Sequence, residues 1–399
     1  MLKIKPWYFD VFAGACGIGI ALGMVRFDFG ILGRMMVDSG WITPAEIGDL
    51  AGINMTGYLL GCFHQSQLKN QRSVVKILMV SLLLVNVSLW LESIPFGFLS
   101  QAICRLICGW GAAHLVIALP GLALTQVPAR MKRNCTAIIM SGGGIGALVA
   151  ALAIGNLSNQ AFWAWVVLSI SATLFSVPIL MLLLGCRTRL NHNVDLSFSG
   201  DQPTDSPRWG NLVLTALVIL GFVLMQVGQV PIVLYEPILA FKKLGLDVAM
   251  SSKSQSLFGL GLALGAIITA LVPRAIPTRL LLPAVSLLGL LGGVMFWKSS
   301  FEITFFLSVF IVGFWDMSTG TLTYDRLGQF SQGQQHRRLW AMATMLGGVG
   351  FIVFSSSTAQ LVDTNLNLIL MLGSIVMAFQ VIAEIFQIEL RGNQKTITD

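Results

Sequence analysis

Residues 19–36 read GIALGMVRFDFGILGRMM, an apolar run that carries Arg26 and Asp28 two positions apart. On an α-helix, side chains at i and i+2 point roughly 200° apart, so these two charges do not neutralise each other. A charged side chain inside a membrane span costs roughly 2.5–3.5 kcal/mol on insertion scales, and it normally faces a cavity or a partner. The stretch therefore predicts a membrane helix whose charged residues have a function.

The composition of the whole chain supports this reading. Of its 399 residues, 55% are hydrophobic and 11% are charged, and the mean hydropathy is +0.79. A soluble globular protein is typically about 25% charged. This small number of charged groups cannot cover a water-facing surface. The sequence therefore predicts an all-α membrane protein in a lipid bilayer.

Twelve apolar segments are long enough to cross a bilayer, which requires about 20 residues. A polar stretch, residues 186–209, divides them into six plus six. We expect an N-terminal six-helix bundle (1–185), a cytoplasmic linker (186–209), a C-terminal six-helix bundle (210–390) and a cytoplasmic tail (391–399). The predicted spans are 8–33, 43–65, 73–92, 96–124, 133–156, 160–185, 210–238, 249–272, 279–297, 301–324, 338–360 and 365–389.

The distribution of basic residues predicts the orientation. If both termini are cytoplasmic, 18 of the 25 Lys and Arg residues lie on the inner side and five lie on the outer side. This asymmetry follows the positive-inside rule. The net charge of +7 therefore reflects topology, and no nucleic-acid partner is expected. The six cysteines show no zinc-like spacing, so we expect no disulfide, metal or cofactor.

An internal repeat relates the two halves. Shifted by 204 residues, Gly57 aligns with Gly261, Gly109 with Gly313, and Arg133 with Arg337. Further aligned glycines are Gly17 with Gly221, Gly61 with Gly265, and three of the four residues of GGIG at 143–146 with GGVG at 347–350. A parallel repeat of this kind predicts two bundles related by a pseudo-two-fold axis along the membrane normal.

The deep ionisable residues fall on every third predicted helix: the first, fourth, seventh and tenth. They are Arg26, Asp28, Arg105, His114, Glu236 and Asp316. Each has a structural alternative, such as a salt bridge that only holds helices together. Their regular placement nevertheless predicts a polar cavity that these four helices surround.

Helical spacing adds polar and aromatic candidates to this cavity. Gln226 and Gln229 align with Glu236, and Thr319 aligns with Asp316. Tyr58 and Trp315 are near these positions, although aromatic residues are commonly packing residues. We predict a substrate site from Arg26, Arg105, Tyr58, Gln226, Gln229, Trp315 and Thr319, and proton-coupling roles for Asp28, Asp316, Glu236 and His114.

Several motifs resemble the major facilitator superfamily over nearly the whole chain. RLICGWGAA, which begins at Arg105, is similar to its R-x-x-x-G pattern, often linked to proton coupling. VRFDFGILGRMM, MTGYLLG and SGGGIGALVA resemble its YbfB/YjiJ-like bacterial branch. The resemblance implies a multi-pass transporter of the bacterial inner membrane. Two departures stand out: Gln65 replaces the acid of the loop motif after the second helix, and the fifth helix lacks the Gly-Pro pair of antiporters.

These observations predict a monomeric, proton-coupled secondary transporter that works by alternating access, with the proton gradient as its energy source. Arg26 and Arg105 favour a small anionic or carboxylate-bearing solute, because guanidinium groups bind carboxylates bidentately. The alternatives are a proton-driven drug or metabolite exporter, for which Asp28 and Asp316 would suit a cation, and a membrane-embedded enzyme or non-transporting sensor. The chain has no HExxH, GxSxG or Walker A motif, so we expect no enzyme.

Overall fold

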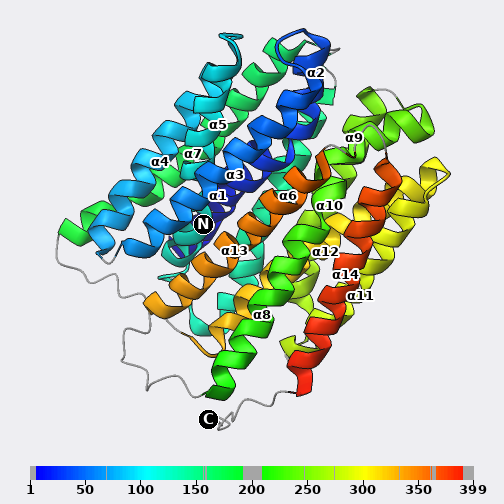
Figure 1. Cartoon of the computed structure of the whole chain (residues 1–399). Coiled ribbons are helices and arrows are strands. Elements are labelled where there is room, and N and C mark those ends of the chain that lie inside the picture. Colours follow the sequence, from blue (N-terminus) through cyan, green and yellow to red (C-terminus); the bar gives the residue numbers. More distant parts are fainter. Residues whose placement is uncertain are drawn as a thin grey trace, which may run out of the picture.

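The computed structural model describes residues 6–68, 70–155, 157, 160–191, 209–246, 248–273, 275–331, 333–359, 361 and 365–389. All regular structure in these residues is helical (Figure 1). The elements are α1 (Pro6–Ile18), η1 (Gly19–Phe27), α2 (Phe29–Asp38), α3 (Pro44–Gln67), α4 (Gln71–Glu92), α5 (Phe98–Ala123), η2 (Ala129–Met131), α6 (Lys132–Gly155), α7 (Ala161–Asn191), α8 (Trp209–Gly228), α9 (Val230–Leu244), α10 (Val248–Leu271), α11 (Thr278–Lys298), α12 (Glu302–Gly328), α13 (Gly333–Ala359) and α14 (Leu366–Glu389).

Eleven helical stretches in the described residues are long and apolar enough to cross a membrane. The stretch missing from the twelve predicted spans is α3, where polar residues such as Glu46, Asp49 and Asn54 lower the mean hydropathy. At 24 residues α3 is still long enough to cross a bilayer. Most of the predicted linker (192–208 of 186–209) and the predicted tail (391–399) lie outside the described residues.

The first predicted span is not one regular helix. It consists of α1, the π-helix η1 and α2, and the backbone N–H of Asp28 donates to the carbonyl of Gly23 at 3.2 Å. The wider turn accompanies close packing against α6: a Cβ built on Gly23 would lie 2.5 Å from the backbone nitrogen of Ala147. Short π segments often occur at functional sites, and this one ends beside Arg26 and Asp28.

The seventh predicted span is also interrupted, at Gln229 between α8 and α9. Pro231 lies two residues further on, and proline lacks the N–H that a continuous helix would use. The backbone N–H groups of Ile232 and Val233 instead both donate to the Gln229 carbonyl at 3.0 Å. The chain thus presents Gln229 at a break in the helix.

The glycine repeat reappears in the packing of the helices. A Cβ built on Gly57 of α3 would lie 2.0 Å from the carbonyl oxygen of Leu106 in α5, and one on Gly261 of α10 would lie 2.3 Å from that of Phe310 in α12. Both partners are also 204 residues apart. Gly61 and Gly265 face Trp110 and Phe314, and Gly109 and Gly313 face Asn54 and Phe258, in the same way. The α3–α5 and α10–α12 crossings are therefore equivalent.

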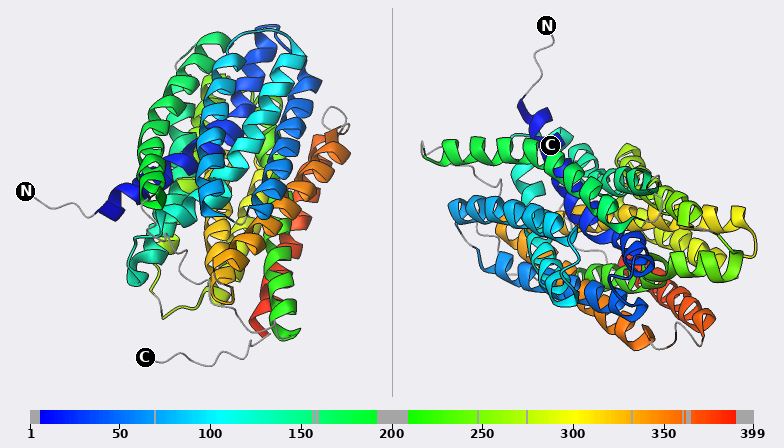
Figure 2. Two further views of the ribbon diagram at one scale, coloured as in Figure 1. Left: turned by 90° about the vertical axis from the view of Figure 1, so that its left-hand side faces the viewer. Right: turned by 90° about the horizontal axis from the view of Figure 1, so that it is seen from above.

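Helices from the two halves of the sequence also pack against each other. α6 lies along α10, and α13 lies along α3 (Figures 1 and 2). Two arginines reach across: Arg133 of α6 donates to the carbonyl of Thr269 at 3.4 Å, and Arg337 of α13 donates to that of Leu68 at 3.3 Å. This repeat-related pair links the halves at one end of the molecule.

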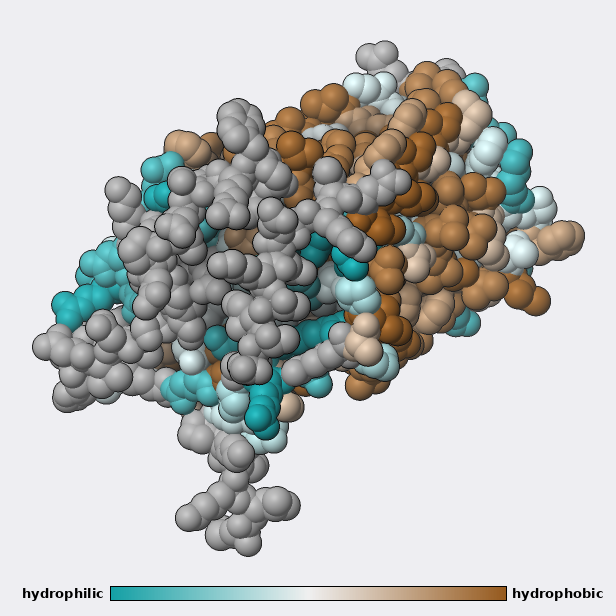
Figure 3. All heavy atoms as spheres, turned by 90° about the horizontal axis from the view of Figure 1, so that it is seen from below, coloured by the Kyte–Doolittle hydropathy of each residue, from teal (hydrophilic) through white to brown (hydrophobic). Residues whose placement is uncertain are grey.

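The outer surface suits a lipid environment. Large hydrophobic side chains such as Leu99, Leu174 and Ile303 are well exposed. Seen from below, hydrophobic residues cover a broad area on one side, while hydrophilic residues gather on the opposite side and along the outer edge (Figure 3). A broad exposed apolar area is the surface expected of a membrane-spanning bundle.

Candidate functional site

Arg26 at the end of η1 connects the two halves of the chain. Its Nη2 donates to Oε1 of Gln226 on α8 at 2.8 Å, and the same oxygen accepts from Nε2 of Gln229 at 2.7 Å. Arg26 and Gln226 are half-buried, and Nε of Arg26 has no hydrogen-bond partner. The predicted association of Arg26 with both glutamines is present in the structure, and the guanidinium retains donors for a ligand.

Other predicted residues surround this guanidinium. Asp316 of α12 and Tyr58 of α3 both interact electrostatically with Arg26. Among the described residues, however, Arg26 and Asp316 form no ion pair, and Oδ2 of Asp316 has no hydrogen-bond partner. The Phe351 ring lies 5.2 Å from the Arg26 guanidinium carbon, within cation–π range. We refer to Arg26, Tyr58, Gln226, Gln229 and Asp316 as the central cluster.

Thr319, one helical turn beyond Asp316, is fully buried on α12, and its hydroxyl has no hydrogen-bond partner. Trp315 is also fully buried, but it faces α11, because a Cβ built on Gly289 would lie 2.3 Å from the indole ring. Its predicted contact with substrate stays a prediction, since the side chain fills the space left by a glycine on a neighbouring helix.

Arg105 does not join the central cluster. Its guanidinium forms a bidentate ion pair with Glu92 at the end of α4, and both side chains are almost fully buried. Nη1 of Arg105 also donates to the carbonyl of Val25 at 3.0 Å. The rings of Phe29 and Trp165 lie 4.7 Å and 5.1 Å from the guanidinium carbon. These contacts satisfy Arg105 within the first half of the chain, and its predicted role in substrate binding stays a prediction.

Asp28 and Glu236 are buried carboxyl groups without a hydrogen-bond partner on either oxygen. Asp28 lies at the junction of η1 and α2, and Glu236 lies on α9; α2 and α9 contact each other. An unpaired carboxylate in the membrane interior costs several kcal/mol. These groups are therefore expected to hold a proton or to find a cation in another conformation, and their predicted role in proton coupling stays a prediction.

His114, the remaining proton-coupling candidate, lies on α5 away from Arg26. Its Nδ1 is 2.6 Å from Oε1 of Gln65, and its ring packs edge-on against His64 and Trp110 at centroid distances of 5.0 Å and 4.5 Å. Gln65, the residue that replaces the motif acid, therefore contacts His114 inside the first half.

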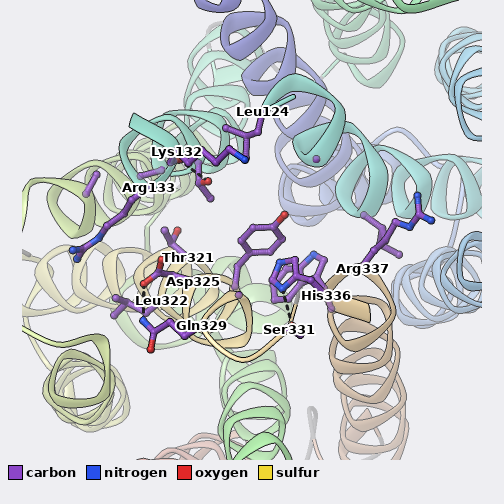
Figure 4. Close-up of a pocket in the computed structure, with 18 of the residues that line it drawn as sticks. Leu124, Lys132, Arg133, Thr321, Leu322, Asp325, Gln329, Ser331, His336 and Arg337 are labelled. Atoms are coloured by element: carbon purple, nitrogen blue, oxygen red, sulfur yellow. Dashed lines mark hydrogen bonds between the residues drawn. The ribbon is translucent and has the colours of Figure 1, made fainter. Parts of the chain in front are cut away.

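A cavity of about 510 Å³ opens between the two halves, at the end where α5 ends and α6 and α13 begin (Figure 4). None of the eleven predicted site residues lines it. Its wall includes Lys132, Arg133, His336, Arg337 and Asp325. The close-up shows His336 and Ser331 on one side and Lys132 on the other. Basic groups thus outnumber acidic groups in this cavity.

A row of aromatic rings runs from the cavity to α8. Tyr324 and Trp340 line the cavity and lie 5.3 Å apart. Trp340 packs against Phe222 at 5.1 Å, and Phe222 lies one helical turn before Gln226 on α8. This row of rings therefore reaches α8 one turn from Gln226 of the central cluster.

Comparison with known proteins identifies the family. The family profile described as "Uncharacterised MFS-type transporter YbfB" matches residues 18–385. The chain belongs to this family. A comparison with curated proteins gives no match.

A solved structure shares the fold of this MFS-type transporter. The proton:xylose symporter XylE, solved with 6-bromo-6-deoxy-D-glucose, superposes with a TM-score of 0.69 at 14% identity, over 94% of each chain. Family and fold together identify a membrane transporter and not an enzyme. The resemblance that the motifs indicated is therefore confirmed.

Three residues near the arginines of this MFS-type transporter were not predicted from the sequence. Glu92, the partner of Arg105, is the last residue of the predicted span 73–92, and its position at a span end concealed its burial. Phe351 contacts Arg26, and Gln255 contacts the neighbouring carbonyl of Phe27. Neither residue carries a charge. Glu92, an acid thirteen residues before Arg105, could have been predicted as its partner from the sequence. Phe351 and Gln255 gave no such signal.

Proposed function

We propose that this MFS-type protein is a proton-coupled secondary transporter that moves a small carboxylate-bearing anion by alternating access. The observation that carries the proposal is the contact of Arg26 with Gln226, which joins the two halves of the chain through a half-buried guanidinium. Arginine suits a carboxylate because its planar fork can donate two parallel hydrogen bonds. Gln229, Tyr58 and Thr319 add polar groups that would orient the solute.

The architecture proposed for this mechanism is two six-helix bundles with twelve passes. α1–η1–α2 and α8–α9 each count as one interrupted pass, and α3 is the pass that falls short of the hydropathy expected of a span. The equivalent α3–α5 and α10–α12 crossings support the pseudo-two-fold relation. We further propose a monomer in the bacterial inner membrane with both termini cytoplasmic, so that the basic cavity faces the cytoplasm.

Proton coupling is proposed for Asp28 and Asp316, followed by Glu236. Asp316 interacts with Arg26 but forms no ion pair with it. An incoming anion can therefore bind Arg26 while Asp316 binds or releases a proton. A carboxyl group that alternates between a protonated and a paired state links proton movement to a conformational change. The proton symport named for XylE shows that this fold supports such coupling.

The second candidate is a proton-driven exporter of a cationic drug or metabolite. The unpartnered Oδ2 of Asp316 favours it, because a buried carboxylate would pair with a cationic amine. The residues required differ between the two functions: an anion needs Arg26, whereas a cation needs Asp316 and is repelled by Arg26.

A thermal-shift screen of purified protein against organic acids, siderophores and cationic drugs tests the proposal. Arg26→Ala is expected to weaken binding of a carboxylate about 10-fold or more, because the lost charge-assisted hydrogen bonds contribute roughly 1.5–3 kcal/mol. Arg34→Ala is the matched control. Arg34 lies on the same interrupted span, and its Nε pairs with Oδ1 of Asp38 at 2.9 Å instead of joining the central cluster. Hits are then tested for uptake driven by a pH gradient in proteoliposomes.

The screen separates the two candidates. Stabilisation by carboxylates that Arg26→Ala removes supports the anion transporter. If cationic drugs stabilise the protein, and this stabilisation is lost in Asp316→Asn but kept in Arg26→Ala, the exporter would replace the anion transporter as the proposed function. Equal shifts in Arg26→Ala and Arg34→Ala would remove Arg26 from the site.

A further inference from the structure

We infer that Gln255 is a positioning residue for Arg26: it holds the backbone next to Arg26 from the opposite half of the chain. The inference rests on the proposed function in one respect, since Arg26 is the proposed solute-binding group. It assigns a role to a residue that touches neither the proposed solute site nor a charged partner.

The contact itself is specific. Nε2 of Gln255 on α10 donates to the carbonyl oxygen of Phe27 at 2.9 Å, and the Gln255 side chain is 6% exposed. One turn along α10, the Phe258 ring meets the Phe27 ring edge to face at a centroid distance of 5.4 Å. Main chain and side chain of Phe27 are therefore both held by the same helix.

The carbonyl on the other side of Arg26 is held as well. Nη1 of Arg105 donates to the Val25 carbonyl at 3.0 Å. Both carbonyls lie at the end of the π-helix, where the change back to α-helix leaves backbone groups available to outside donors. Arg26 thus lies between two anchored peptide groups, one bound by Arg105 of its own half and one bound by Gln255 of the other half.

The two anchors differ in what they depend on. Arg105 and Val25 belong to the same half, so a rocking of the halves leaves that bond intact. Gln255 and Phe27 belong to different halves, so their bond exists only while α10 remains against the first span. The direction of the Arg26 side chain toward Gln226 is therefore coupled to the contact between the halves at this level.

The chemical reactivity of Arg26 tests this role without a transport substrate. Purified protein in lipid nanodiscs is treated with phenylglyoxal, and modification of Arg26 is followed by mass spectrometry. In Gln255→Met the lost hydrogen bond is expected to release Arg26 from Gln226 more often and to raise its modification rate roughly two- to tenfold. Gln226→Leu, which removes the acceptor of Arg26 directly, gives the upper reference.

A matched control lies one turn earlier on the same helix. The hydroxyl of Ser252 donates to the carbonyl of Ala151 at 2.8 Å, which is also a buried bond between α10 and the first half but joins α10 to α6 and not to the backbone next to Arg26. Ser252→Ala is expected to leave the Arg26 rate unchanged. Gln255→Leu replaces Gln255→Met if the latter does not purify as a monodisperse protein.

The outcomes are distinct. A faster reaction in the Gln255 variants with an unchanged rate in Ser252→Ala supports the inference. Equal rates in the Gln255 variants and the parent, or an equal increase in Ser252→Ala, would overturn it. Because no solute is present, failure of the transport proposal would leave either result unaffected.

Discussion

At the scale of residues, Arg26 and Arg105 both lie among apolar helices but have different partners. Arg105 is enclosed by Glu92, two aromatic rings and the Val25 carbonyl, whereas Arg26 is half-buried and bonds to a neutral amide. A buried charge that is fully paired is held in place. A buried charge with a neutral partner and an unused donor is available to a ligand. The arginine with fewer partners is therefore the better candidate for solute binding.

Removal of Glu92 tests the structural role of Arg105. Glu92→Gln should destabilise the protein by about 3–5 kcal/mol, because it leaves a buried guanidinium without its counter-charge. The apparent Tm in detergent, followed by tryptophan fluorescence, measures the loss. Asp38→Asn breaks the exposed Arg34–Asp38 pair and should cost about 0–1 kcal/mol. If both variants melt together, the Arg105–Glu92 pair contributes no more than a surface pair.

The residues of the central cluster were partly predictable. Arg26, Gln226, Gln229 and Asp316 were selected because polar groups in apolar spans must face one another, and the structure brings them together. Trp315 was selected by sequence proximity alone, but the direction of a buried ring depends on the small residue opposite, here Gly289. That information lies in a distant helix and not in the local pattern.

At the scale of elements, glycines determine which helices touch. At Gly57 and Gly261 the neighbouring backbone occupies the space that a side chain would need, so α3 lies directly on α5 and α10 lies directly on α12. The aligned glycines predicted that the two halves are related, and small residues mark close helix contacts in membranes, but which helices cross at them was not predicted. The π-helix η1 was not predictable, since a nine-residue change of helix type leaves no clear trace in hydrophobic periodicity.

Single methyl groups test these crossings. Gly57→Ala and Gly261→Ala should each destabilise the protein by about 1–3 kcal/mol or more, because a Cβ 2.0–2.3 Å from a carbonyl oxygen forces the helices apart. Gly52→Ala on α3 is the control: its Cβ would have no neighbour within 4 Å, and alanine favours the helix by roughly 0.5–1 kcal/mol. The apparent Tm of the three variants compares them. A Gly57→Ala protein as stable as Gly52→Ala would show that α3 and α5 can separate without loss.

At the scale of the whole molecule, the two halves meet through polar contacts at several levels. Arg133 and Arg337 cross at the cavity end, Arg26 and Gln226 meet in the middle, and Gln255 holds Phe27 further along. Each contact joins a side chain of one half to the other half. A rocking motion can exchange such bonds for water without breaking the core of either half, which is what alternating access requires.

A substitution of Asp28 tests the coupling of this motion to protons. Asp28→Asn should abolish accumulation of solute driven by a pH gradient but permit exchange of labelled for unlabelled solute, because the amide keeps the shape of the buried carboxyl group yet cannot take up and release a proton. Both processes are measured in the same proteoliposomes. Asp38→Asn, an exposed acid on the same span, should leave accumulation and exchange unchanged. If Asp28→Asn accumulates solute normally while Asp316→Asn does not, the proton moves with the carboxyl group near Arg26, and Asp28 is a structural acid at the junction of η1 and α2.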